Sequence, residues 1–168
     1  MLKLFARNIF RFLFLLLLQV FLFNRIELSG YLNPYVYVLF ILLLPFETPR
    51  WSGLILAFMM GLGIDLFTGT IGIHATATVF MAYLRPFVLE MISPRDGYEI
   101  GSFPRIHYYG FSWFLKYSLI LVFAHHFVLF YLEVFKFEDF FSTLLRVLLS
   151  VIFSVTLIIL SQYVIFRR

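Results

Sequence analysis

The chain has 168 residues, of which 62% are hydrophobic and 13% charged, and its mean hydropathy is +0.97. Soluble domains carry about 25% charged residues, so this composition excludes an ordinary soluble domain and predicts an integral membrane protein. The net charge of +4 comes without a basic patch among exposed aromatic residues, which argues against nucleic-acid binding, and the lack of cysteine excludes disulfides and thiolate metal sites.

The apolar runs predict an all-α bundle of six transmembrane helices that forms a single domain, 1–168. Helices are expected because backbone groups in the bilayer core must find their hydrogen-bond partners within the protein, and because these runs do not alternate apolar and polar residues as barrel strands do. The second expected helix is short for a bilayer about 30 Å thick. In chain order the expected helices cover about 9–23, 31–45, 51–67, 72–89, 113–135 and 141–166.

The basic residues predict the orientation of this bundle. Cytoplasmic loops carry the excess of lysine and arginine, and most of the 13 basic residues fall on one side of the threading. Only Arg25 and Lys136 fall on the other side, and Arg146 lies at a helix edge. We therefore expect both termini in the cytoplasm and 90–112 as a cytoplasmic loop. The residues on the cytoplasmic side are Lys3, Arg7, Arg11, Arg50, Arg85, Arg95, Arg105, Lys116, Arg167 and Arg168.

A row of small residues follows one face of the third expected helix. Gly53, Ala57, Gly61 and Asp65 recur every four residues, which places them on one side of a helix. Small residues at this spacing let helix backbones approach closely. The row therefore predicts either a docking surface for the transmembrane helix of a partner or packing between the helices 51–67 and 72–89, the second of which carries its own small residues.

Asp65 is the sharpest single candidate, because a carboxylate inside an apolar helix is costly and by default suggests a functional site. A plainer interpretation is that it caps the turn at Gly69 or pairs with Arg146 across helices. Together with His74 and His125 these residues predict a polar cluster near the outer surface. We expect interhelical hydrogen bonds there and no metal or cofactor, since the adjacent His125 and His126 point about 100° apart on a helix.

No catalytic motif is present, so an enzyme is not expected. The stretch Gly61-Leu62-Gly63-Ile64-Asp65-Leu66-Phe67, followed by Gly69 and Gly72, resembles the central segment of the MreD family. That resemblance implies a small, non-enzymatic, multi-pass subunit of the bacterial cytoplasmic (inner) membrane. It also implies work beside an MreC-like bitopic partner, linking the MreB filament to the peptidoglycan synthases of the rod-shape machinery. The family pattern carries over to Gly61, Asp65, Gly69 and Gly72.

A second interpretation comes from another class of protein. The MreD family is similar to the substrate-binding membrane components of energy-coupling-factor transporters, which are also small and six-helical. On that interpretation Asp65 and His74 would line a pocket for a small molecule. A cavity at the outer end with several inward polar side chains favours the transporter, whereas a filled core with an exposed groove of small residues favours the docking subunit.

Overall fold

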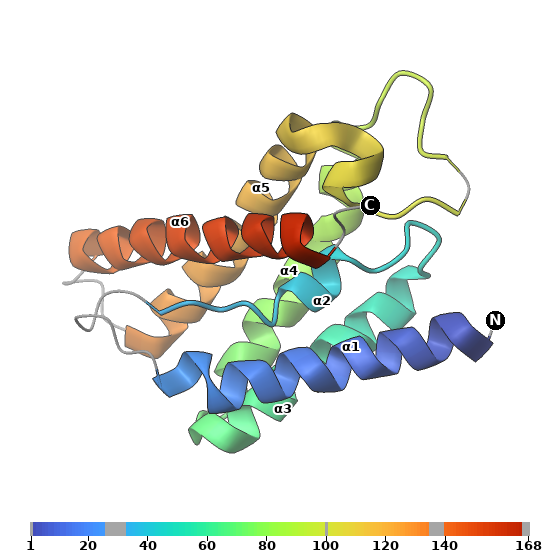
Figure 1. Ribbon diagram of the computed structural model, residues 1–168. Coiled ribbons are helices and arrows are strands. Elements are labelled where there is room, and N and C mark those ends of the chain that lie inside the picture. The colour runs from blue at the N-terminus through green and yellow to red at the C-terminus, as the bar shows by residue number, and fades with distance from the viewer. Residues whose placement is uncertain (1, 26–32, 100, 135–139, 166–168) are drawn as a thin grey trace.

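A computed structural model describes residues 2–25, 33–99, 101–134 and 140–165 of the chain (Figure 1). In these residues all the regular secondary structure is helical, and there are no strands. The helices α3 (Arg50–Thr68), α5 (Ile106–Val134) and α6 (Phe140–Ile165) are each long and apolar enough to cross a membrane. The chain is therefore an all-helical protein with the character of a membrane protein, and the further spans remain a prediction. The other elements are α1 (Leu2–Phe21), η1 (Phe23–Arg25), α2 (Leu39–Leu42) and α4 (Ile73–Met91).

The long helices pack largely in chain order. α3 lies against α4, α4 against α5 and α5 against α6, while α1 contacts α3. The stretch of chain that contains α2 runs between α1 on one side and α6 on the other (Figure 1). Its position makes this stretch, and not one of the long helices, the centre of the bundle.

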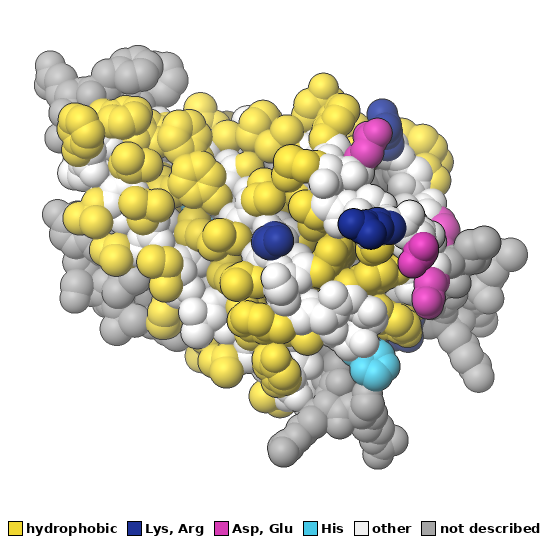
Figure 2. Space-filling model, turned by 90° about the horizontal axis from the view of Figure 1, so that it is seen from above, with side chains coloured by type: hydrophobic (Ala, Val, Ile, Leu, Met, Phe, Trp, Pro, Cys, Tyr) yellow, Lys and Arg dark blue, Asp and Glu magenta, His cyan; other side chains and the backbone are white. Residues whose placement is uncertain are grey.

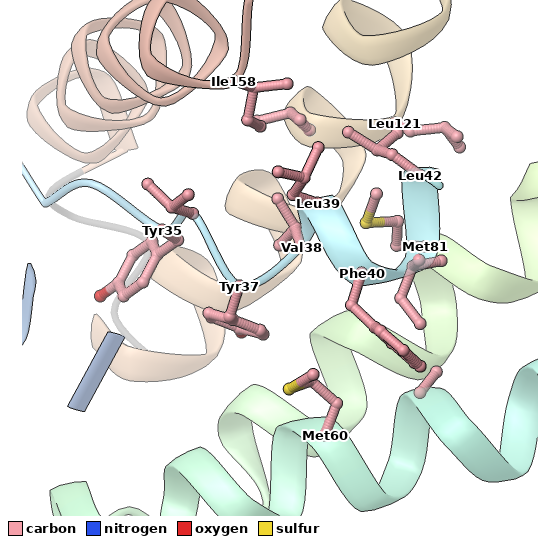
Figure 3. Close-up of a cluster of buried hydrophobic side chains, with 14 of the residues drawn as sticks. Tyr35, Tyr37, Val38, Leu39, Phe40, Leu42, Met60, Met81, Leu121 and Ile158 are labelled. Atoms are coloured by element: carbon pink, nitrogen blue, oxygen red, sulfur yellow. The ribbon is translucent and has the colours of Figure 1, made fainter. Parts of the chain in front are cut away.

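The prediction of a second helix over 31–45 is wrong for the part of this range that the structure describes, 33–45. Residues 33–38 are not helical, and only Leu39–Leu42 form a short helical turn. Nevertheless the side chains of residues 35–44 are all buried. Figure 3 shows Val38, Leu39, Phe40 and Leu42 on this segment, surrounded by side chains from α3, α4, α5 and α6. We call residues 33–45 the core segment.

Two other helix limits differ from the expectation. α1 begins at Leu2 and not near residue 9, and α5 begins at Ile106, inside the expected loop 90–112. The connection between α4 and α5 is therefore shorter, 92–105. Gly110, which lies in the expected loop, forms a kink within α5, with φ 80° and ψ 169°. Glycine adopts this positive φ without the steric cost that a side chain would bring.

The charged end of the molecule is well packed. Figure 2 shows hydrophobic side chains over most of one face, with charged side chains gathered toward one end. There the Tyr98 ring stacks on Phe46, with 4.2 Å between ring centroids, and its hydroxyl donates to the Leu89 carbonyl at 2.7 Å. Burial raises the pKa of Tyr98 to about 12, so the phenol stays neutral and able to donate. The connection 92–105 is thus anchored on the bundle through Tyr98.

Candidate functional site

Gly61 lies where the backbones of α3 and α4 touch. A Cβ atom at this position would lie 2.4 Å from the Cα of Ala75 and 2.6 Å from the carbonyl oxygen of His74. Ala57, one turn earlier in the row, is fully buried, and Asp65, one turn later, is 2% exposed. Most of the small-residue row therefore packs inside the bundle, where a partner helix has no access to it. Gly53, at the start of the row, has only Thr48 nearby, at 4.0 Å.

The Asp65 side chain binds the beginning of α4. Its carboxylate oxygens accept hydrogen bonds from the backbone N–H groups of His74 and Ala75, each at 3.0 Å, and from the Thr70 hydroxyl at 2.6 Å. The first N–H groups of a helix have no partner within the helix, and a negative charge is favourable at that end. Asp65 therefore caps α4 from the neighbouring helix, and its hydrogen bonds account for a carboxylate inside an apolar helix.

Gly69 and Gly72 shape the turn between α3 and α4. Both have positive φ, 71° and 77°, and Gly69 ends α3 by donating its N–H to the Asp65 carbonyl at 2.9 Å. Left-handed backbone favours glycine, since a Cβ atom adds strain there. Gly61, Asp65, Gly69 and Gly72, which carry the resemblance to the MreD family, thus build one structure, the α3–α4 hairpin.

A chain of buried polar side chains runs from α4 through the core segment to α6. At its centre, the Tyr37 hydroxyl lies 2.7 Å from Nε2 of His125 and 3.3 Å from Nδ1 of His74. His125 in turn lies next to His126, with 3.4 Å between their Nδ1 atoms. The sequence indicated His74 and His125 as members of one cluster, and Tyr37 is the residue that joins them.

The contacts of His126 fix which of its nitrogens carries the proton. Its Nδ1 lies 2.9 Å from the Val122 carbonyl, which can only accept, so Nδ1 is the donor. Its Nε2 therefore accepts from the Ser154 hydroxyl at 3.1 Å. The Ser154 oxygen accepts in turn from the backbone N–H of Tyr35 at 3.0 Å, so each contact has one donor and one acceptor.

The direction of the remaining bonds follows from that tautomer. Because Nδ1 of His126 carries a proton, a second proton on the adjacent Nδ1 of His125 would place two donors against each other. The proton of His125 therefore lies on Nε2, which donates to the Tyr37 oxygen. Tyr37 then donates its own proton to Nδ1 of His74. With neutral imidazoles throughout, the remaining proton of His74 lies on Nε2.

A polar cavity of about 250 Å³ lies at the end of the bundle where α3 turns into α4. His74 lies in its wall, and Glu133 and Arg146 form an ion pair there, with 3.3 Å between Oε2 and Nη1. The interpretation that Asp65 pairs with Arg146 is therefore wrong. The expected cluster is assembled only in part, because His74 and Arg146 line the cavity and Asp65 and His125 do not. The described residues that line it are Gln19, Phe23, Asn24, Asn33, Pro34, Tyr35, Thr68, Thr70, Ile73, His74, Leu129, Glu133 and Arg146.

A second cavity, of about 260 Å³, is an apolar groove between α1 and α3. The two helices touch at Gly63, where a Cβ atom would lie 2.4 Å from Cδ1 of Leu16. We call this cavity the α1–α3 groove. Its lining residues are Asn8, Ile9, Phe12, Leu13, Phe40, Leu56 and Met59.

Gln19 holds the first part of the core segment. Its Oε1 accepts from the backbone N–H groups of Val36 at 2.9 Å and Tyr37 at 3.3 Å, and its Nε2 donates to the Pro34 carbonyl at 3.0 Å. These bonds give backbone groups of the core segment the hydrogen-bond partners that they would otherwise find within a helix. Non-helical backbone at membrane depth is tolerated where other groups of the protein satisfy its N–H and carbonyl groups in this way. Sequence reasoning missed this residue, although a glutamine in an apolar run was an available signal.

Arg85 and Tyr117 hold the other end of the core segment. Arg85 donates from Nη2 to the Leu44 carbonyl and from Nε to the Tyr117 hydroxyl at 2.9 Å, and Tyr117 donates to the Leu42 carbonyl at 3.0 Å. Arg11 adds a bond to the Leu43 carbonyl at 3.1 Å. From the sequence, both arginines were expected to lie on the cytoplasmic side. In the structure they also bind the carbonyl groups at the end of α2, where positive charge is stabilising.

Among the described residues no three His, Cys, Asp or Glu side chains are grouped to hold a metal ion. The imidazoles of His125 and His126 are engaged by neighbouring groups of the protein, and the buried polar chain is thus a hydrogen-bonding network. Comparisons of the chain with protein-family models, with curated proteins and with solved structures found no match. The candidate sites are therefore the polar cavity and the α1–α3 groove, described by their own geometry.

Proposed function

We propose that this protein is a non-enzymatic membrane subunit of the bacterial cell-wall elongation machinery. In this role it docks an MreC-like bitopic protein beside the MreB filament and the peptidoglycan synthases. One observation carries the proposal: Gly61, Asp65, Gly69 and Gly72, the residues of the MreD-like motif, cooperate in the α3–α4 hairpin. Because these four residues act together in one hairpin, they support the resemblance more strongly than a short sequence match alone would.

The docking surface must lie outside the small-residue row, since most of that row is covered by α4. The α1–α3 groove offers an alternative, with Leu13 and Met59 exposed on its two walls and Phe40 within it. Helices in lipid associate through close packing and a few hydrogen bonds, not through hydrophobicity. An apolar groove with Asn8 as a polar group in its lining meets both needs. We assign to it the single transmembrane helix of the MreC-like partner.

Filling the groove should release that partner. Leu13→Trp and Met59→Trp place a large ring in the groove, and both side chains are about half exposed, so the bundle itself should fold. Overpacking an interface costs about 1–3 kcal/mol, so we expect recovery of the partner with the tagged protein to fall about tenfold. Quantitative co-purification from membranes that contain both proteins measures this.

Ile152→Trp is the matched control, because Ile152 lies on α6, is 62% exposed and does not line the groove. This variant should recover the partner as the wild type does. If the groove variants, eluting as folded protein on size exclusion, recover as much partner as Ile152→Trp, the docking assignment is refuted.

A small-molecule-binding subunit of an energy-coupling-factor type transporter is the second candidate. The polar cavity favours it, since several polar residues line this cavity at the expected outer end. Such a subunit would bring a pair of ATPases and a larger coupling protein through purification, whereas a wall-elongation subunit would not.

A further inference from the structure

We propose that the polar cavity binds a small zwitterion, an amino acid or a short peptide, from the outer side of the membrane. The cavity presents one anionic and one cationic side chain side by side, together with a neutral donor and amide groups. This inference does not depend on the wall-elongation role, because it uses neither the α3–α4 hairpin nor the α1–α3 groove.

The ion pair of Glu133 and Arg146 indicates the chemical class of the ligand. Glu133 and Arg146 meet at 3.3 and 3.4 Å, which is longer than the 2.7–2.9 Å of a strong charge-assisted bond. The Glu133 side chain is 41% exposed, so it remains open to a second positive group. A ligand ammonium fits beside Glu133 and a ligand carboxylate beside the guanidinium of Arg146. A zwitterion also adds no net charge to the site, which limits the cost of taking charges out of water.

His74 contributes a neutral imidazole with a defined tautomer to the cavity wall. The hydrogen-bond directions of the buried chain leave the His74 proton on Nε2, since its Nδ1 accepts from Tyr37. His74 lies in the cavity wall together with the side chains of Asn24 and Asn33. A side chain whose tautomer is fixed by a buried chain needs no rearrangement when a ligand arrives, which lowers the cost of binding.

The volume of the cavity and the residues in its wall limit the size of the ligand. Its volume of about 250 Å³ lies just below the usual range for small-molecule pockets, about 300–1,000 Å³. Phe23, Ile73 and Leu129 form apolar parts of the wall, which suits a short aliphatic side chain. An amino acid or a dipeptide fits these dimensions, whereas a larger peptide does not.

The absence of cysteine from the chain permits a direct test in the full-length protein. Ile73→Cys places a thiol in the cavity wall, and Ile71→Cys places one in the adjacent turn, where the side chain is 99% exposed. Each variant, purified and placed in lipid nanodiscs, is treated with a charged, water-soluble thiosulfonate reagent. The rate of modification is measured with and without alanine or alanyl-alanine.

We expect both cysteines to react and a zwitterion to slow the reaction of Ile73→Cys alone. The rate should fall by the factor 1 + [L]/Kd, about tenfold when the ligand is at ten times its Kd. N-acetylalanine, which lacks the ammonium, and alaninamide, which lacks the carboxylate, should protect far less. Adding Glu133→Gln to Ile73→Cys should remove the protection, measured for each protein as the ratio of its own rates without and with ligand.

Three results would overturn the proposal. The first is an Ile73→Cys that does not react, since the cavity would then be closed to water. The second is no protection by either zwitterion at millimolar concentration. The third is equal protection by the two blocked compounds. None of these results bears on recovery of the MreC-like partner, so the two proposals fail or stand separately.

Discussion

Gly61→Ala is expected to destabilise the protein by about 3 kcal/mol, the upper part of the range for overpacking a tight interior. The added Cβ would meet backbone atoms of Ala75 and His74 at 2.4–2.6 Å, and backbone cannot move aside as a flexible side chain can. Separating α3 from α4 would also pull Asp65 from the N–H groups that it caps. The midpoint of unfolding in mild detergent, followed by circular dichroism, measures the loss.

Gly53→Ala is the matched control, since it is the same substitution two turns earlier on the same helix. Its Cβ would have only the methyl group of Thr48 nearby, at 4.0 Å. Gly53 is only partly buried, and replacing a helical glycine with alanine where there is room for the methyl group stabilises a helix by up to about 1 kcal/mol, so the midpoint should stay or rise. Equal midpoints for the two variants would show that the helices do not touch at Gly61.

Gln19→Leu is expected to cost about 3 kcal/mol or more, even though it makes α1 more apolar. The substitution keeps the volume roughly constant but leaves the N–H groups of Val36 and Tyr37 and the Pro34 carbonyl without a side-chain partner. A buried polar group without a partner costs about 1–3 kcal/mol. The same unfolding experiment measures the effect, and hydrogen exchange at residues 36 and 37 should rise with it.

Gln162→Leu separates this effect from the burial of a glutamine as such. Gln162 is 3% exposed, and neither its Oε1 nor its Nε2 has a hydrogen-bond partner among the described residues. Its replacement should be neutral or stabilising, because an unsatisfied polar group is removed. A Gln19→Leu protein as stable as Gln162→Leu would contradict the role given to Gln19 in holding the core segment.

The long helices could be predicted from the sequence, because their apolar runs are long and their ends carry glycine, proline or charge. α3, at Arg50–Thr68, and α6, at Phe140–Ile165, lie within a residue or two of the expected 51–67 and 141–166. The core segment could not be predicted in the same way. Its apolar residues suit a helix equally well, and the groups that make a helix unnecessary lie far away in the sequence, on α1, α4, α5 and α6.

The candidate site was predictable only where its residues act locally. Asp65 and the glycines around it lie within a dozen residues, so a motif indicated them together. The Glu133–Arg146 pair and the link from His74 through Tyr37 to His125 depend on how the helices are arranged in space. Spacing along one helix carries no information about such pairs. For the same reason the row of small residues left docking and internal packing open until the position of α4 was known.

Affinity purification of the tagged protein from its native membranes in mild detergent, with mass spectrometry of the proteins that accompany it, tests the central claim most directly. The account predicts an MreC-like bitopic membrane protein together with peptidoglycan synthases, enriched over a mock purification. Recovery of paired ATPases with a larger membrane coupling subunit, and no wall-elongation protein, would contradict it.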